Sequence, residues 1–156
     1  MMLLQSILSP ERTFWGASGT SKKRALLEAS RLLAETIPQL TEDQIFDAII
    51  NREKLGSTAL GNGIAIPHCR IENCAKTIGA LLKLDTATDF ESPDDKPVDL
   101  LFILLVPVES TDTHLETLAM LAGLFQNEEF CAALRRSTNS ENLYQLAVNT
   151  AEKLAA

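Results

Sequence analysis

The 156-residue sequence is poor in the features on which several function classes depend. Basic residues number 14 against 21 acidic residues, so the formal net charge is −7. A protein that binds nucleic acid needs a clustered basic face, and this balance argues against such a partner. The longest apolar run, 100–108, is far shorter than the ~20 residues of a membrane-spanning helix. The amino terminus has no basic segment before its apolar residues, which argues against a secretory signal peptide.

Cysteine is also scarce and is not arranged for disulfide or metal binding. The three cysteines, Cys69, Cys74 and Cys131, form an odd set without a C-x-x-C pair. This usage is typical of reduced thiols in a reducing compartment, so we expect a cytoplasmic protein without disulfides. A zinc site needs three or four close ligands, and the histidines and cysteines here show none of the usual ligand spacings. The sequence therefore predicts no metal site.

Hydrophobic residues make up 46% of the chain, enough for the core of a single domain over 1–156. Apolar periodicity and capping residues predict helices over 21–37, 41–54, 113–126, 127–136 and 140–154. Nearly continuous apolar runs predict buried strands over 78–84 and 98–106, joined by a solvated loop over 85–97, and residues 12–17 can form a short edge strand. Helices before and after a small central sheet predict a layered α/β domain.

The segment around which these elements converge is 52–70, with the sequence REKLGSTALGNGIAIPHCR. Glycines such as Gly63 let backbone N–H groups approach a ligand closely, and a compact anion such as a phosphoryl group suits that geometry. Residues 64–68, which follow Gly63, are predicted to form a short strand that ends on His68. Pro67 restricts the backbone there, so the histidine is held in place and is predicted to be the reactive group.

A second histidine lies in a setting that suits the same ligand. Thr113 and Glu116 match a capping box, which places His114 in the first turn of a helix, where free N–H groups favour an anion. We predict that His68 supplies a nucleophilic nitrogen and that His114 and Arg52 contact the phosphoryl group. Four further residues are predicted to contact the phosphate. They are Ser57 and Thr58 through their hydroxyls, Gly63 through its backbone, and Thr113 at the helix cap.

Two other chemistries fit these residues less well. A Cys–His nucleophile would need Cys69 or Cys74 beside a histidine, yet adjacent residues of a strand point to opposite faces, so His68 and Cys69 should not share a site. The glycine spacing G-x-x-x-x-G-N-G lacks the Lys and Ser/Thr of a nucleotide-binding loop, which excludes a Walker motif.

Three segments of the sequence carry a resemblance to a known family. They are REKLGST with GNGIAIPH over 52–68, PVDLLF over 97–102 and THL over 113–115. They resemble the EIIA domains of the fructose/mannitol superfamily of the bacterial phosphotransferase system, above all the nitrogen-related EIIA-Ntr branch. The resemblance spans nearly the whole chain and includes SKKRA at 21–25 and LY at 143–144. Cys69 departs from the pattern, because the family often has glycine or another small residue after the histidine.

The resemblance implies a mixed central β-sheet sandwiched between α-helices, with His68 as phosphoryl acceptor and His114 and Arg52 lining its site. It implies no cofactor. It implies a phosphorylated NPr/HPr-like carrier as donor, and regulated target proteins such as potassium-transport or sensor-kinase components. Two alternatives remain open at this point. One is a sugar-specific EIIA that passes the phosphoryl group to an EIIB for fructose- or mannitol-type uptake, and the other is an interaction module with vestigial histidines.

Overall fold

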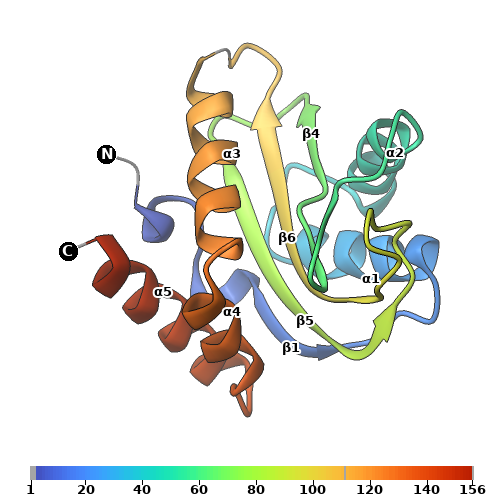
Figure 1. Ribbon diagram of the computed structural model, residues 1–156. Coiled ribbons are helices and arrows are strands. Elements are labelled where there is room, and N and C mark those ends of the chain that lie inside the picture. The colour runs from blue at the N-terminus through green and yellow to red at the C-terminus, as the bar shows by residue number, and fades with distance from the viewer. Residues whose placement is uncertain (1–2, 111, 156) are drawn as a thin grey trace.

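A β-sheet forms the middle of three layers in the computed structural model, which describes residues 3–110 and 112–155 (Figure 1). Within this part of the chain the strands are β1 (Thr13–Ala17), β2 (Ala59–Gly61), β3 (Ile64–Ala65), β4 (His68–Ile71), β5 (Ile78–Thr88) and β6 (Val98–Pro107). The helices are α1 (Lys22–Ala34), α2 (Glu42–Glu53), α3 (Asp112–Phe125), α4 (Glu128–Arg135) and α5 (Ser140–Ala155). Two short 3₁₀ helices, η1 (Leu4–Ser6) and η2 (Pro10–Arg12), precede β1.

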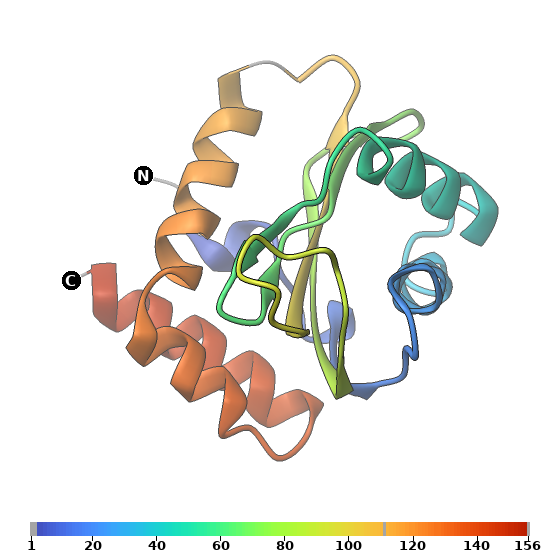
Figure 2. The same cartoon turned by 45° about the vertical axis from the view of Figure 1, so that its right-hand side comes forward.

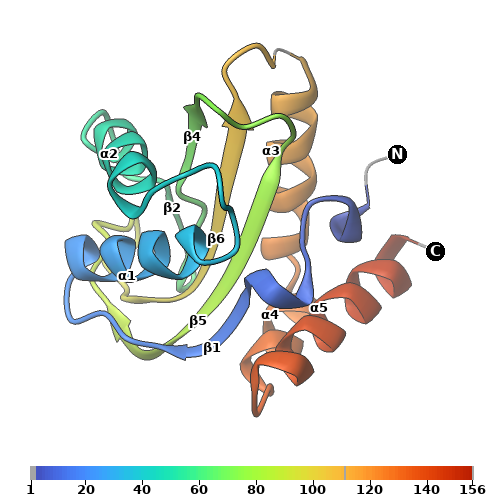
Figure 3. The same ribbon diagram turned by 180° about the vertical axis from the view of Figure 1, so that it is seen from behind.

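The helices are divided between the two faces of the sheet. Figure 2 shows α1 and α2 on one side and α3, α4 and α5 on the other, and Figure 3 shows the same arrangement from behind. Each face has its own apolar core. Leu33, Ile49 and Leu101 belong to the core under α1 and α2, whereas Phe102 and Phe125 belong to the core under the carboxy-terminal helices. The predicted fold, a mixed sheet between α-helices, is confirmed.

The strand β6 is the centre of the sheet. The order is β1-β5-β6-β3-β2, with β4 also paired to β6. β5 runs antiparallel to β6, whereas β3 and β4 run parallel to it, so the sheet is mixed. Both faces of β6 are buried, which explains its nearly continuous apolar sequence. The strand predicted over 98–106 is therefore confirmed, and β1 is the predicted edge strand.

Local capping signals placed two helix starts correctly. The Ser21 hydroxyl accepts a hydrogen bond from the Arg24 N–H at the start of α1. Thr41 and Gln44 form a complete capping box at the start of α2. For α3 the prediction was wrong in position, because the helix begins at Asp112 and Thr113 falls in its first turn. The side chain of Thr113 lies outside the described part of the structure.

Two element ends also differ from prediction. α1 ends at Ala34 and not at 37, because the chain turns at Glu35 and Thr36 ahead of Pro38. Ile37 is still buried, so its apolar character reflects the core and not the helix. β5 continues to Thr88, beyond the predicted end at 84, because Thr88 pairs again with Val98 of β6 after an irregularity in the register between Lys83 and Thr88. Across the described residues, no helix combines the length and apolar character that a membrane crossing requires.

Candidate functional site

His68 lies at an interruption between two strands that share one neighbour. Ile64 of β3 is opposite Leu100 of β6, and His68 of β4 is opposite Leu104 of the same strand. Pro67 has no N–H to donate and separates the two, while its carbonyl accepts a hydrogen bond of 2.9 Å from Leu104 N. The prediction that one strand ends on His68 was therefore wrong, since the histidine begins a second strand.

Three of the predicted site residues come together from separate elements. Arg52 lies in the last turn of α2, His68 begins β4 and His114 lies in the first turn of α3. The rings of His68 and His114 have centroids 5.8 Å apart. All three residues line one pocket of about 390 Å³ at the β4 edge of the sheet, together with Ala48, Asn51, Leu55, Cys69 and Arg70.

The imidazole of His68 is oriented by a backbone carbonyl. Its Nδ1 lies 2.7 Å from the carbonyl oxygen of Ile66. A carbonyl oxygen can only accept a hydrogen bond, so Nδ1 carries the hydrogen in the neutral ring. The lone pair of a neutral imidazole is then on Nε2.

The surroundings of His68 favour the neutral ring. The side chain is half-buried, and burial is the largest cause that lowers its pKa below 6.5. The hydrogen bond to Ile66 acts in the opposite direction, the positive charge of Arg52 lowers the pKa further, and the carboxylate of Glu53 raises it. The net effect is a lowered pKa for His68, so the unprotonated ring dominates at neutral pH.

His114 is also held neutral. Burial lowers its pKa, and His68 and Arg70 add to the lowering. Its Nδ1 is buried and has no hydrogen-bond partner in the part of the chain that the structure describes. A dianion placed in the pocket would be near this ring and would favour its protonated form.

Arg52 keeps most of its hydrogen-bonding capacity. One nitrogen, Nη1, donates to the carbonyl of Gly56 at 3.1 Å, which holds the side chain at the end of α2. Within residues 3–110 and 112–155, no carboxylate forms an ion pair with it. Its planar fork therefore has donors left for phosphate oxygens.

The structure does not bring the other described candidates to this pocket. The Ser57 hydroxyl donates to the Phe90 carbonyl at 2.7 Å, and the buried Thr58 hydroxyl donates to Glu53 at 2.6 Å. Gly63 follows β2 at the far end of β3, where a Cβ would lie 2.6 Å from Arg135 and 2.8 Å from Asp99. Its φ of +80° and this crowding explain the glycine. The glycine turn is a feature of the sheet and does not surround His68.

Sequence reasoning missed one charged residue of the pocket. Arg70 stands two residues after His68 on β4, so the two side chains share a face. Its guanidinium donates to the carbonyls of Val108 and Ser110, which links β4 to the segment that leads into α3. The sequence could have predicted this, because residues two apart on a strand, such as His68 and Arg70, lie on the same face.

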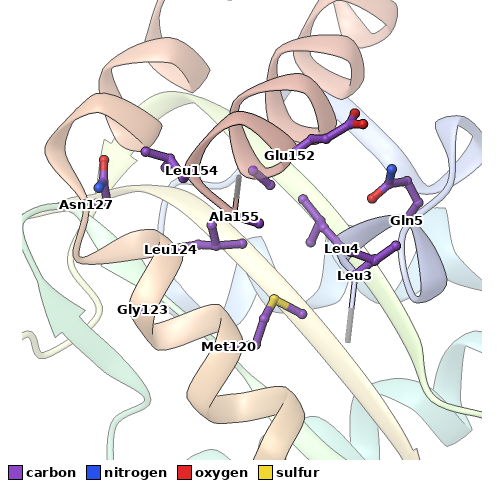
Figure 4. Close-up of a pocket in the computed structure, with 11 residues that line it drawn as sticks. Leu3, Leu4, Gln5, Met120, Gly123, Leu124, Asn127, Glu152, Leu154 and Ala155 are labelled. Carbon is purple, nitrogen blue, oxygen red and sulfur yellow. The ribbon is translucent and has the colours of Figure 1, made fainter. Parts of the chain in front are cut away.

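A second pocket is apolar and carries little chemistry. It has a volume of about 350 Å³ and lies between η1, α3 and α5. Its lining includes Leu4, Met120, Leu124 and Leu154, with Glu152 as the charged member (Figure 4). Among the described residues, no group of three or more histidines, cysteines and acidic residues is placed to hold a metal ion. The pocket at His68 is therefore the candidate functional site.

All three cysteines are buried and free. Cys69 lines the pocket but belongs to the core under α1 and α2, and as the next residue of β4 it directs its side chain to the other face from His68. Burial raises the pKa of its thiol to about 12. Cys69 therefore acts as an apolar filler and not as a nucleophile beside His68.

Comparisons with known proteins give consistent similarities over most of the chain. The family model described as "Phosphoenolpyruvate-dependent sugar phosphotransferase system, EIIA 2" matches residues 6–149. The nitrogen regulatory protein of Pseudomonas aeruginosa is 44% identical over 149 residues, covering 96% of this chain and 97% of the relative. The nitrogen regulatory protein of Escherichia coli K12 is 43% identical over 148 residues, covering 94% and 90%.

Solved structures show the same similarity in three dimensions. The crystal structure of nitrogen regulatory protein IIA-Ntr from Neisseria meningitidis superposes with a TM-score of 0.81 at 37% identity, covering 91% of this chain and 97% of that one. IIA mannitol from Escherichia coli superposes with a TM-score of 0.74 at 22% identity, covering 90% and 98%. The latter likeness concerns the fold alone.

Proposed function

Because the chain belongs to the EIIA type-2 family of the phosphotransferase system, in its nitrogen-regulatory branch, we propose that it is a phosphocarrier and regulator phosphorylated on His68. The donor is a phosphorylated NPr/HPr-like carrier protein. The observation that carries the proposal is one pocket that is lined by a neutral, oriented imidazole, a second histidine and a guanidinium that forms no ion pair with any described carboxylate.

The reacting atom in this proposal is Nε2 of His68. Nδ1 is occupied by its hydrogen bond to Ile66, so only Nε2 has a lone pair to offer. The Nε2–P bond forms as the N–P bond of the carrier's phosphohistidine breaks, and the electron pair of that bond stays on the carrier's imidazole. The transfer needs no metal or organic cofactor. Contact between the two proteins excludes water, which limits hydrolysis of the phosphohistidine.

Arg52 and His114 supply charge and donors to the transferred group. The Arg52 fork matches phosphate oxygens, and its positive charge offsets the negative charge of the phosphoryl group. His114 donates a hydrogen bond and takes up a proton once a dianion lies beside it. Thr113, in the same turn of α3, remains a predicted contact of the phosphoryl group.

The regulatory output rests on the two states of His68. A phosphoryl group adds a dianion to a pocket that otherwise presents Arg52, Arg70 and two neutral histidines. Target proteins then bind one state in preference to the other. Components of potassium transport and sensor kinases are the proposed targets, and the name of the relatives, nitrogen regulatory protein, supports a regulatory role in general.

Labelling by a phosphorylated carrier tests the proposal. We expect the wild type to gain one phosphoryl group, His68→Ala to gain none, and His114→Ala to be labelled more slowly or to lose the label faster. Equal labelling of all three proteins would contradict the assignment. Addition of a purified EIIB with sugar separates the alternative role in transport, because rapid sugar-dependent loss of the label would indicate a sugar-specific EIIA.

A further inference from the structure

Glu53 is a buried carboxylate that the proposed chemistry does not use. It follows Arg52 in the last turn of α2 and is only 5% exposed. Its oxygens accept hydrogen bonds from Thr58 N at 2.9 Å and from the Thr58 hydroxyl at 2.6 Å. The Lys22 ammonium lies 2.7 Å from the same carboxylate. Removing a charged carboxylate from water costs free energy even when three partners compensate it, so the burial of Glu53 points to a specific role.

The contacts of Glu53 continue through the backbone to the reactive ring. The Thr58 carbonyl accepts a hydrogen bond of 3.1 Å from the Ile66 N–H. The carbonyl of Ile66 in turn accepts the bond from His68 Nδ1 at 2.7 Å. A hydrogen-bonded path therefore runs from Lys22 on α1 through Glu53 and Thr58 to the imidazole of His68.

This path crosses the part of the sheet where regular pairing is weakest. β3 has two residues, and Pro67 breaks the ladder before β4 begins. The bond from Ile66 N to Thr58 O holds Ile66 from the other side. The direction of the Ile66 carbonyl thus depends on where Thr58 is fixed, and Glu53 fixes Thr58 through both its N–H and its hydroxyl.

We propose that Glu53 is a positioning residue for His68, which keeps the Ile66 carbonyl in place so that Nδ1 holds the hydrogen and Nε2 stays free to accept a phosphoryl group. The expected effect of Glu53 on phosphoryl transfer rests on the proposed function. The positioning itself is a property of the unphosphorylated protein.

Glu53 also acts on the charge of the His68 ring. The charged and titratable groups around His68 are Arg52 and Glu53 from α2, Arg70 on β4 and His114 from α3. Arg52 opposes a proton on His68, and Glu53 acts in the opposite direction. Glu53 therefore also offsets part of the positive charge at a site that must keep a basic nitrogen.

Nitrogen-15 NMR of the imidazoles in the whole protein, without carrier, tests the inference. We expect the wild-type His68 ring to carry its hydrogen on Nδ1. Glu53→Ala should shift the ring toward a mixture of the two tautomers. Glu53→Gln keeps an acceptor for Thr58 and should preserve the wild-type tautomer. The control is Asp99→Asn, which breaks the Arg135–Asp99 ion pair in another part of the sheet and should leave the ring unchanged.

Transfer from the phosphorylated carrier gives the second readout. We expect Glu53→Ala to lower the maximal rate about tenfold or more with little change in the apparent KM for the carrier, because the nucleophile is misoriented and the contact surface is intact. If Glu53→Ala fails to fold, Thr58→Val removes one of the two bonds and should shift the tautomer in the same direction. A wild-type tautomer in both variants overturns the inference, as does an equal shift in Asp99→Asn.

The two failures are distinguishable. If wild-type protein is not labelled by the carrier, the proposed function is wrong, and the NMR result still decides the role of Glu53. If labelling depends on His68 but the tautomer of His68 is unchanged when Glu53 is replaced, the phosphocarrier proposal stands and the positioning role is wrong.

Discussion

At the scale of single residues, the protonation of His68 decides when the pocket can act. Burial lowers its pKa below 6.5, so the folded protein resists protonation of this ring. We expect an NMR titration of His68 to give a midpoint below the ~6.5 of an unperturbed histidine. Phosphoryl acceptance should stay constant from pH 8 down to about that value and fall only below the measured midpoint.

His114 must be separated from this titration, because the pKa of His114 is lowered as well. The His114→Ala variant leaves one histidine and assigns the signal. A His68 midpoint above that of an unfolded control peptide would contradict the neutral-nucleophile interpretation. The same ring affects stability, because between its folded midpoint and about pH 6.5 it binds more protons in the unfolded chain than in the folded protein. Its contribution to stability is therefore present above about pH 6.5 and is lost as the pH falls through that window.

Cys69 gives a second prediction at this scale. With a thiol pKa of about 12, the thiolate fraction at pH 8 is about 10⁻⁴, against roughly a quarter for an unperturbed cysteine. We expect iodoacetamide to leave Cys69 unmodified in the native protein during the time in which the urea-unfolded chain is fully alkylated. Mass spectrometry of peptides identifies the site, and rapid native labelling at Cys69 would show that the thiol is accessible and ionised.

The residues of the pocket differ in how far the sequence could predict them. His68, His114 and Arg52 were predicted to share a site and do line one pocket. Local signals placed each residue at the end or start of an element, and the family resemblance indicated that the three belong together. Ser57 and Thr58 were predicted to contact the phosphoryl group, and neither lines the His68 pocket. Their hydroxyls are bound to Phe90 and Glu53, and such choices depend on partners that only the folded chain brings near.

At the scale of elements, the glycine turn between β2 and β3 has a structural role. Gly61, Asn62 and Gly63 all have positive φ, and the Arg135 guanidinium donates to the Asn62 carbonyl at 2.7 Å. The sequence showed a glycine cluster but did not show which group packs closely against it. That group is the Arg135–Asp99 ion pair, which packs against Gly63.

Gly63→Ala tests this assignment. A methyl group would meet Arg135 and Asp99 below 3.0 Å at a strained φ, so we expect a loss of about 1–3 kcal/mol in the free energy of unfolding. Urea denaturation measures it. Labelling of the folded fraction by the carrier should be unchanged, because Gly63 does not line the His68 pocket.

The matched control is Gly56→Ala. A Cβ at Gly56 meets no atom of the described residues within 4 Å, so the expected change lies within about 0.5 kcal/mol. If Gly63→Ala instead leaves stability intact and abolishes labelling, the glycine turn contacts the phosphoryl group after all.

At the scale of the whole molecule, the site exists only because three distant segments meet at one edge of the sheet. The sequence predicted the helices and the two long strands from local patterns. It did not predict that β3 and β4 share β6, or that β2 and its glycine turn lie away from His68, because strand order depends on long-range pairing. The shared neighbour β6 fixes His68 relative to the helices on both faces.

The surface around the pocket should be where the carrier protein docks. Leu55 is 85% exposed and lines the pocket, and Leu115, next to His114, is 67% exposed. Leu55 lies in the turn after α2 and Leu115 lies on α3, and exposed leucines on both sides of one reactive group are typical of a protein contact. Leu55→Glu and Leu115→Glu should each raise the apparent KM for the phosphorylated carrier about tenfold, because each puts a charge where apolar surface must be desolvated.

Leu60→Glu is the matched control, since Leu60 is 41% exposed on β2 and does not line the pocket. Its apparent KM should remain that of the wild type, and thermal unfolding should show all three variants folded. The NMR tautomer of His68 should also be unchanged in all three, because these leucines bind none of the groups that orient the ring. Equal losses in all three variants would mean that added negative charge anywhere repels the carrier. A loss confined to Leu55 and Leu115 would place docking over the edge of the sheet where α2, β4 and α3 converge.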